Sequence, residues 1–192
     1  AFSRSKKLYN YWVKKIFPKV QENVDIKPFT TFGVGGKVAW YLKVTTPEEL
    51  VEAFLKAKSY YSRRLSRDPD YPSGLKPLIM SGGSNVVFAD KTYPRLLIHY
   101  LCEPEVKPRI TIRGLTSGAS ITCEAGLPLA KLIKFAIDNN LAGLEALSGI
   151  PGAVGGAVVG NAGAYGQAIS DHIKKVQIFD GVKTKWISKK QA

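Results

Sequence analysis

A glycine-dense segment from Gly143 to Gly166, GLEALSGIPGAVGGAVVGNAGAYG, does not suit an ordinary core helix or strand. Glycine has no side chain to pack and loses the most backbone entropy on folding. Flexible linkers are also glycine-rich, but they are polar. This segment instead carries apolar residues, which are Leu144, Leu147, Ile150, Val154, Val158 and Val159. We therefore expect ordered backbone that approaches a ligand or another segment closely.

Composition places the chain among globular proteins. Of its 192 residues, 45% are hydrophobic and 22% are charged, which separates it from disordered chains. The length permits one domain or two small lobes. No stretch reaches the ~18 uninterrupted apolar residues of a membrane span, and the opening AFSRSKKLYNYWVKK lacks the apolar region of a signal peptide. We expect a cytoplasmic protein without a membrane partner, whereas its oligomeric state is not readable from the sequence.

The chain carries a formal net charge of +13, which favours anionic partners such as nucleic acid, phosphate-bearing cofactors or acidic surfaces. Its basic residues cluster at Arg4 to Lys19, Arg63 to Arg67 and Lys174 to Lys190. None of these clusters carries a recognisable nucleic-acid-binding motif. We therefore interpret most of them as solvated surface and predict no nucleic-acid partner.

The cysteines and histidines do not predict a metal site. Cys102 and Cys123 lie far apart without a CxxC motif, and His99 and His172 are equally isolated. Cys123 lies in the apolar-alternating stretch SITCEA and is predicted to be a buried thiol. Two unpaired cysteines fit a reducing compartment such as the cytoplasm.

Local patterns predict more strands than helices. Alternation in residues 37–44 places Trp40, Leu42 and Val44 on one face of a strand, and Asp180-Gly181 is typical of a hairpin turn. A chain with many strands and few helices is expected to have an α+β fold. The expected strands are residues 77–80, 86–88, 96–101, 109–113, 120–125, 175–179 and 182–187.

The clearest helix start is Thr46-Pro47-Glu48-Glu49. Thr46 can cap the helix, Pro47 suits its first turn, and Glu49 completes a capping box. The other elements expected are helices at residues 8–17 and 127–139, an exposed basic loop at 60–76, and a connection between lobes at 103–108.

The familiar phosphate-binding glycine motifs do not fit this chain. The sequence GVGG at residues 33–36 lacks the G-x-G-x-x-G spacing and precedes a strand. Residues 155–160 have Walker-loop glycine spacing, but Asn161 and Ala162 stand where Lys and Ser or Thr are required. Gly156 and Gly160 form a GxxxG pattern of membrane helices. Pro151 and the many glycines argue against a helix there.

A second glycine segment, Ser81-Gly82-Gly83-Ser84-Asn85, lies between two expected strands. Gly82 and Gly83 can take positive φ and direct backbone N–H groups into one concavity, which can bind phosphate oxygens. Ser84 and Asn85 add side-chain donors. All of these residues are also ordinary turn formers, so this segment alone does not separate a phosphate nest from a tight turn.

Three blocks taken together resemble a known family. From about Asn23 to near the C-terminus, the chain resembles the FAD-binding part of the UDP-N-acetylenolpyruvoylglucosamine reductase family, the UDP-N-acetylmuramate dehydrogenases of bacterial peptidoglycan synthesis. Ser81 departs mildly from the pattern, which commonly shows another glycine there. The blocks are TFGVGG at residues 31–36, GGSNVV at 82–87, and the third segment with GLE at 143–145, SGIPG at 148–152 and NAGAYG at 161–166.

The resemblance implies a two-lobed α+β FAD-binding domain of the vanillyl-alcohol-oxidase (PCMH) type. After a basic N-terminal segment, 1–20, its lobes would span residues 21–103 and 104–192, with FAD between them. The residues that would hold the pyrophosphate are Gly82, Gly83, Ser84 and Asn85. Those that would line the other side of the cofactor are Ile150, Pro151, Gly152, Gly155 and Gly156, with Asn161 and Gly163 near the flavin.

The resemblance also implies a reaction. NADPH would reduce FAD, and the flavin would then reduce UDP-N-acetylglucosamine enolpyruvate to UDP-N-acetylmuramate, a step that serves cell wall biogenesis, cell shape and cell division. In the family, a tyrosine–arginine–x–serine motif and a separate substrate domain supply the catalytic Arg, Ser and Glu. The chain stops at Gln191-Ala192. We therefore expect it to bind FAD, to lack the domain for the UDP-sugar, and to be catalytically incomplete.

Two other functions stay open. Another FAD-dependent oxidoreductase of the same fold would share the glycine nest, but such enzymes often link flavin covalently through His or Cys, and both histidines lie outside the glycine blocks. The net charge also permits a non-enzymatic basic nucleic-acid-binding module. Flavin colour in the purified protein distinguishes that module from the two flavoproteins.

Overall fold

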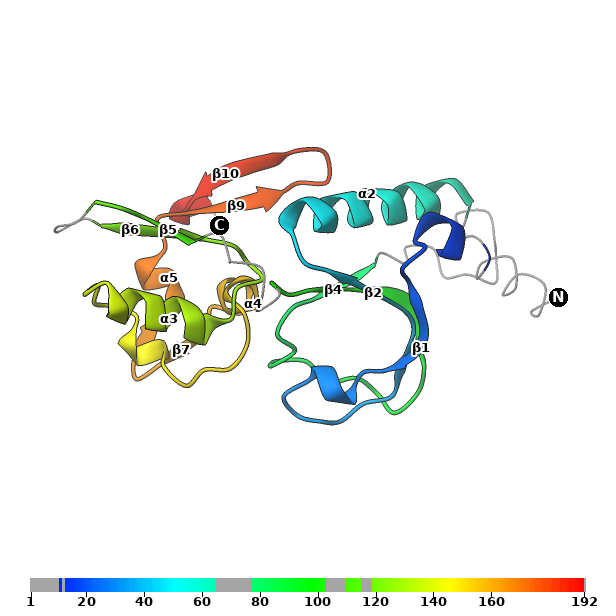
Figure 1. Cartoon of the computed structure of the whole chain (residues 1–192), viewed down its shortest axis with the longest axis horizontal. Coiled ribbons are helices and arrows are strands. Elements are labelled where there is room, and N and C mark those ends of the chain that lie inside the picture. The colour runs from blue at the N-terminus through cyan, green and yellow to red at the C-terminus, as the bar shows by residue number, and fades with distance from the viewer. Residues whose placement is uncertain (1–10, 12, 65–76, 103–109, 115–118, 192) are drawn as a thin grey trace. The chain divides into compact units, whose positions relative to one another are not determined.

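The computed structural model describes residues 11, 13–64, 77–102, 110–114 and 119–191. The chain divides into two compact units, Ala1–Tyr100 and Leu101–Ala192. Both contain helices and strands (Figure 1), which confirms the predicted α+β class. The segment expected to connect two lobes lies outside the described residues.

A four-stranded sheet forms the centre of the first unit. β2 (Lys37–Val44), β4 (Tyr93–Tyr100) and β3 (Leu78–Met80) run parallel, and β1 (Gln21–Asp25) pairs antiparallel with β2. The strand order is β1-β2-β4-β3. The buried halves of β2 and β4 have nearly continuous apolar sequences, WYL and LLI, as expected of strands covered on both faces.

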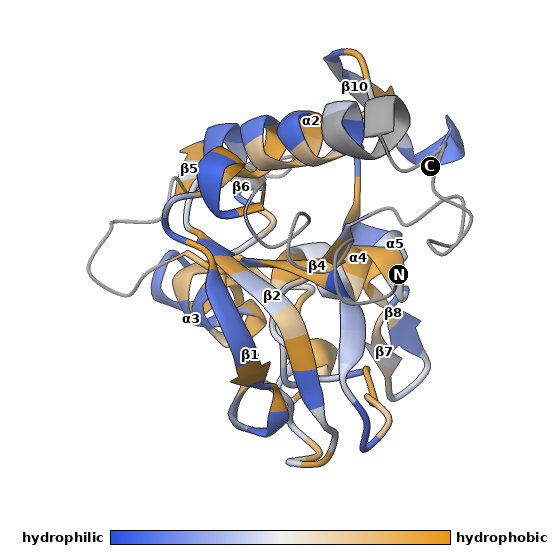
Figure 2. Cartoon of the chain, turned by 90° about the vertical axis from the view of Figure 1, so that its right-hand side faces the viewer, coloured by the Kyte–Doolittle hydropathy of each residue, from blue (hydrophilic) through white to orange (hydrophobic). Residues whose placement is uncertain are grey.

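The two faces of this sheet are covered differently. α2 (Pro47–Arg64) lies along one face (Figure 1), where its Ala53 and Ala57 pack against β2 and β4. Trp40, Leu42 and Val44 belong to that face, as the alternation predicted. Loops cover the opposite face, where the packed residues include Ile26, Phe29, Tyr41, Met80, Phe88 and Leu97. Figure 2 shows apolar and polar residues alternating along α2, which matches a helix packed by one face.

The start of α2 confirms the predicted cap. The Glu49 amide donates to the Thr46 hydroxyl oxygen at 3.1 Å. The Glu49 carboxylate accepts a 2.8 Å bond from the Thr45 amide, one residue earlier than a standard capping box. This backbone hydrogen bond lowers the pKa of Glu49 below its ordinary value.

Two predictions in this unit were wrong. α2 continues to Arg64, because no proline or glycine interrupts the sequence before Pro69, so the predicted loop does not begin at residue 60. The remainder of that predicted loop, 65–76, lies outside the described residues. Residues 86–88 form no strand. Their alternation is real, since Val86 and Phe88 pack on the core while Val87 is exposed, but no neighbouring strand pairs with them.

The first predicted helix agrees with the structure as far as it is described. Residues 11 and 13–16 are helical, and residues 8–10 of that prediction lie outside the described part. Val13 and Phe17 pack on the same cluster as α2. Short 3-10 turns occur at Lys27–Phe29, Glu145–Leu147 and Lys189–Gln191.

The second unit is built from hairpins and short helices. The predicted strands and the Asp180-Gly181 hairpin are confirmed, as is the helix predicted at residues 127–139. The elements are β5 (Ile110–Arg113), β6 (Ser120–Cys123), α3 (Leu129–Asp138), α4 (Val154–Val159), β7 (Gly163–Ala164), β8 (Gln167–Ala168), α5 (Ile169–His172), β9 (Lys175–Phe179) and β10 (Thr184–Ser188).

The glycine-dense segment is ordered and contains a helix. Pro151 and the glycines argued against one, yet α4 runs through Gly155 and Gly156 because Val154 and Ala157 bury its inner face. The helix ends in a Schellman turn at Asn161, whose φ is 45°. Most of the apolar residues in the segment join one core with α3, and these are Leu144, Leu147, Ile150, Val154 and Val158. Val159 is the exception, at 91% exposure.

The cysteine prediction held only in part. Cys123 packs against the core of the second unit but stays partly exposed, whereas Cys102 is the buried thiol. The Cys102 thiol donates a 3.2 Å hydrogen bond to the Glu124 carboxylate.

Candidate functional site

The segment 81–85 follows β3, so it lies at the carboxyl end of a parallel strand, where ligands commonly bind in open sheets. Of its two glycines, Gly83 has a positive φ of 63°, whereas Gly82 is outside the left-handed region. A Cβ on Gly83 would collide with the Phe29 carbonyl oxygen. The Thr31 amide donates a 3.0 Å bond to the Gly83 carbonyl. Gly83 is thus required for the close approach of residues 29–31.

The same loop presents unused hydrogen-bond donors. The amides of residues 82–85 donate to no carbonyl within the described part of the chain. There, the side chains of Ser84 and Asn85 also have no hydrogen-bond partner. Asn85 is exposed and Ser84 is half-buried. Neighbouring donors with little side-chain bulk are the kind of groups that bind anions in proteins.

A polar network lies beneath this loop, and sequence patterns do not predict it, since they show only a histidine in an apolar strand. His99 is 2% exposed. Its Nδ1 lies 2.7 Å from the Tyr41 hydroxyl and its Nε2 lies 2.9 Å from the Ser81 carbonyl oxygen. The Ser81 hydroxyl donates to the Tyr100 carbonyl at 2.9 Å. Burial lowers the pKa of His99 and raises that of Tyr41, so both are neutral near pH 7.

In the second unit, the segment leading into α4 pairs with the segment leading into α3. Pro128 and Ala153 form an antiparallel bridge, and the Val154 amide donates to the Leu127 carbonyl at 2.9 Å. The Gly155 amide donates to the Ala125 carbonyl at 2.7 Å. The Gly155 amide is therefore engaged within the second unit, so any contact of this residue with a ligand would be made by other atoms.

The remaining predicted site residues differ in what they can offer. Ile150 packs on the core, whereas Pro151 is exposed and Gly152, with a φ of 115°, is half-buried. Gly156 is exposed, and a Cβ built there meets nothing within 4 Å. The open backbone surface at Gly156 leaves room for a ligand to approach.

Two further predicted residues have structural partners. The Asn161 side-chain oxygen accepts a 3.3 Å bond from the Ser170 amide. A Cβ on Gly163 would lie 2.6 Å from the Gln167 carbonyl oxygen across the β7–β8 pair. Tyr165, in the same turn, is 91% exposed with a φ of 53°.

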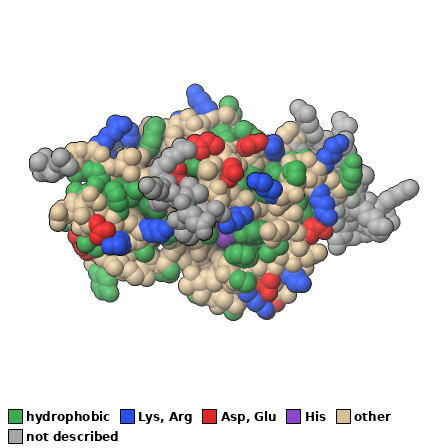
Figure 3. Space-filling model, in the orientation of Figure 1, with side chains coloured by type: hydrophobic (Ala, Val, Ile, Leu, Met, Phe, Trp, Pro, Cys, Tyr) green, Lys and Arg blue, Asp and Glu red, His purple; other side chains and the backbone are tan. Residues whose placement is uncertain are grey.

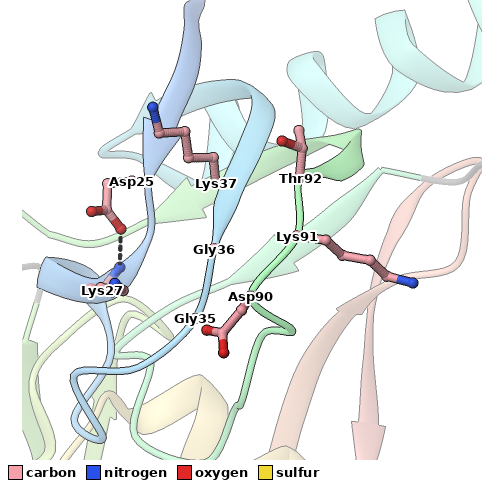
Figure 4. Close-up of a pocket in the computed structure, with 8 residues that line it drawn as sticks. All are labelled: Asp25, Lys27, Gly35, Gly36, Lys37, Asp90, Lys91 and Thr92. Atoms are coloured by element: carbon pink, nitrogen blue, oxygen red, sulfur yellow. Dashed lines mark hydrogen bonds between the residues drawn. The ribbon is translucent and has the colours of Figure 1, made fainter.

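A separate hollow of about 250 Å³ lies in the first unit (Figure 4). Gly35 and Gly36 of the first glycine block line it, but none of the predicted site residues does. Lys37 and Lys91 extend in different directions, and the Asp25 carboxylate already accepts a 3.0 Å bond from the Lys27 amide. The other lining residues are Asp90 and Thr92. Nothing in this hollow converges on one ligand position.

The described residues contain neither a membrane-spanning helix nor a metal-binding group of side chains. None of the described helices combines the length and the apolar character needed to cross a lipid bilayer. Within that same part of the chain, His, Cys, Asp and Glu side chains form no group of three that could hold a metal ion.

Sequence comparisons identify the family of the chain. Residues 41–183 match the family described as FAD binding domain. A UDP-N-acetylenolpyruvoylglucosamine reductase from Synechococcus sp. (strain JA-3-3Ab) is 34% identical over 168 residues, covering 88% of this chain and 47% of the relative. The reductase of the same name from Mycobacterium sp. (strain MCS) is 35% identical, covering 84% and 39%. The chain thus spans about half the length, or less, of these curated relatives.

Solved structures agree on the fold. The crystal structure of UDP-N-acetylenolpyruvylglucosamine reductase from Thermus caldophilus is similar with a TM-score of 0.63 and 28% identity, over 90% of this chain and 53% of that one. A solvent-stable cholesterol oxidase is similar with a TM-score of 0.60 at 15% identity, over 83% and 32%, and shows the fold alone. These likenesses confirm the predicted fold class, a FAD-binding domain of the vanillyl-alcohol-oxidase type. With the family match across most of its length, the chain belongs to the FAD-binding domain family and corresponds to the FAD-binding part of UDP-N-acetylenolpyruvoylglucosamine reductases.

Proposed function

We propose that the chain is the FAD-holding part of an NADPH-dependent reductase that converts UDP-N-acetylglucosamine enolpyruvate to UDP-N-acetylmuramate. The names of its relatives support this reaction. The observation that carries the proposal is the row of unused donors at residues 82–85 beside the carboxyl end of β3. The proposal includes a role in cell wall biogenesis, cell shape and cell division, in the cytoplasm.

The proposed task of the first unit is to hold the pyrophosphate. Gly82 and Gly83 keep the loop free of side chains, so its amides can approach the phosphate oxygens. The Ser84 hydroxyl and the Asn85 amide add two further donors. Hydrogen bonds to a charged acceptor are stronger than those between neutral groups, so each donor contributes noticeably to affinity.

The proposed task of the second unit is to line the cofactor with backbone. Pro151, Gly152 and Gly156 have the exposure for this role, whereas Ile150, Gly155, Asn161 and Gly163 shape the segment through the contacts described above. When bound, FAD would supply the redox chemistry between NADPH and the substrate. The Arg, Ser and Glu that would act on the UDP-sugar are not assigned to residues of this chain.

We propose that the two lobes of the FAD-binding domain are residues 21–103 and 104–192.

The distribution of charge supports a cofactor-binding protein over a nucleic-acid-binding module. On the face drawn in Figure 3, Lys and Arg side chains are scattered among acidic and apolar ones. Several described lysines also have acidic partners, as in the pairs Lys14–Glu22, Lys56–Glu52 and Lys185–Asp180. A net positive charge raises the local concentration of any anionic ligand, including a dinucleotide.

Titration with FAD, followed by quenching of flavin fluorescence, tests the proposal. We expect the chain to bind FAD, and Ser84→Ala and Asn85→Ala each to weaken binding about tenfold or more, since one hydrogen bond to a charged group is worth about 1.5–3 kcal/mol. Asn139→Ala is the matched control, because that exposed side chain bonds the Phe135 carbonyl outside both glycine segments. Absence of FAD binding, or equal affinities in all variants, would contradict the assignment.

A second assay tests the division of labour. We expect these 192 residues with FAD to show no NADPH-dependent reduction of the enolpyruvyl substrate. Full turnover by the same polypeptide would show that groups within it act on the substrate and would require a new search for catalytic residues.

A further inference from the structure

A chain of two linked hydrogen bonds, one buried and one partly buried, ends at Ser81, the first residue of the candidate phosphate loop, residues 81–85. The Tyr41 hydroxyl lies 2.7 Å from His99 Nδ1, and His99 Nε2 lies 2.9 Å from the Ser81 carbonyl oxygen. These residues come from β2, from β4 and from the turn after β3, so the chain crosses all three parallel strands. It links the centre of the sheet to the backbone just before Gly82.

The direction of each hydrogen bond follows from chemistry. The Ser81 carbonyl can only accept, so His99 Nε2 must carry the proton. In the neutral imidazole, Nδ1 is then an acceptor and the Tyr41 hydroxyl donates to it. Burial favours the neutral form, which lowers the pKa of His99. Tyr41 thus donates to His99, and His99 donates to the Ser81 carbonyl.

The side chain of Phe29 packs against both ring systems of the network. Phe29 stacks on Tyr41 with a centroid distance of 5.1 Å and meets His99 edge-on at 5.5 Å. The Phe29 carbonyl is the same group that excludes a side chain at Gly83. Phe29 therefore contacts both the polar network and the phosphate loop, so a shift of His99 is transmitted to the loop by packing as well as by hydrogen bonding.

We propose that His99 and Tyr41 are positioning residues, which hold Ser81 so that the donors of residues 82–85 face a bound pyrophosphate. This inference rests on the proposed function, because it names what sets the geometry of that site. Neither side chain contacts the ligand itself. Without the His99 bond, Ser81 keeps its hydroxyl bond to Tyr100, but its partly buried carbonyl loses its partner, and the loop is expected to shift.

Three variants and one control test this role through FAD affinity. Gln can donate its amide from near the position of Nε2, so His99→Gln should bind FAD within about threefold of wild type, whereas His99→Leu should bind about tenfold or more weakly. Tyr41→Phe, which removes one donor, should fall between them. Ile98→Val is the control, because Ile98 is equally buried but belongs to the cluster beneath α2. Equal loss in His99→Leu and His99→Gln, or wild-type affinity in His99→Leu, would overturn the proposal.

A second readout needs no cofactor. The Thr31 amide donates to the Gly83 carbonyl, so its hydrogen exchange in the apoprotein reports the position of the loop. We expect faster exchange at Thr31 in His99→Leu but not in His99→Gln, with the Gly36 amide, which donates to the Ala89 carbonyl, as an unaffected reference. Unchanged exchange at Thr31 in His99→Leu would overturn the positioning role. If wild type bound no FAD, the proposed function would fail, and this exchange measurement would still decide the role of His99.

Discussion

Gly155 and Ala125 approach each other so closely that a side chain on Gly155 has no room. The Gly155 amide donates a 2.7 Å hydrogen bond to the Ala125 carbonyl, and a Cβ built on Gly155 would lie 2.8 Å from the Ala125 Cβ. The next residue is different, because a Cβ built on Gly156 meets nothing within 4 Å. Neighbouring glycines in α4 thus serve different purposes, one for internal packing and one for an open surface.

The first prediction contrasts these two glycines. Gly155→Ala should lower the free energy of unfolding of the second unit by about 1–3 kcal/mol, because the added methyl group overpacks a contact between two backbones. Gly156→Ala should preserve stability, or raise it by up to about 1 kcal/mol through helix propensity, while weakening FAD binding. Urea denaturation and FAD titration measure the two effects. Equal destabilisation by both substitutions would show that the open surface at Gly156 is wrong.

The second prediction concerns the start of α2. Thr46→Ala removes the hydroxyl oxygen that accepts the Glu49 amide and should cost about 1 kcal/mol of stability in the first unit. Thr46→Ser keeps that acceptor and should stay near wild type. Urea unfolding monitored by circular dichroism compares the three proteins. Similar losses in the alanine and serine variants would assign the effect to the Thr46 methyl group instead of the cap.

Local chemistry explains which elements the sequence predicts. The alternation of Trp40, Leu42 and Val44, the cap at Thr46 and the Asp180-Gly181 turn each depend on residues close together in the chain, and each agrees with the structure. α4 was missed because its first turn is stabilised by hydrogen bonds to residues 125 and 127, which precede α3 in the sequence. Alternation at residues 86–88 reflects packing on a core without a partner strand, which periodicity alone does not distinguish from a strand.

The candidate site also has features that the sequence predicts and features that it does not. Composition identifies residues 82–85 as a donor-rich loop, because glycine, serine and asparagine are residue types whose donors can be recognised from the sequence alone. The hydrogen bond between Tyr41 and His99 beneath the loop cannot be predicted from the sequence, since these residues are 58 positions apart and meet only because their strands are neighbours. The amide of Gly155 shows the same limit: the sequence does not reveal that it is paired with the Ala125 carbonyl, because that pairing is tertiary.

The third prediction concerns thiol reactivity. Burial, with the neighbouring Glu124 charge, raises the pKa of Cys123 to about 11. Only about one in a thousand of these thiols is ionised at pH 8, so native Cys123 should react with iodoacetamide roughly a hundredfold more slowly than in urea, where its pKa is ordinary. Mass spectrometry of the Cys123 peptide measures both rates. Equally fast labelling in native protein and in urea would contradict the raised pKa.

The fourth prediction concerns acid titration of the hairpin turn. Asp180 has a pKa lowered from 3.8 to about 2, first by the hydrogen bond from the Lys183 amide, then by the Lys185 side chain and the Val182 amide. Because the folded pKa lies below the unfolded one, the carboxylate stabilises the turn fully above pH 3.8, and this contribution is lost as the pH falls towards 2. The amide chemical shifts of Val182 and Lys183 should therefore titrate with a midpoint near 2. Asp180→Asn keeps an oxygen that can accept both amides but cannot ionise, so its shifts should stay flat over the same range. A wild-type midpoint near 4 would mean that the turn does not hold the carboxylate as described.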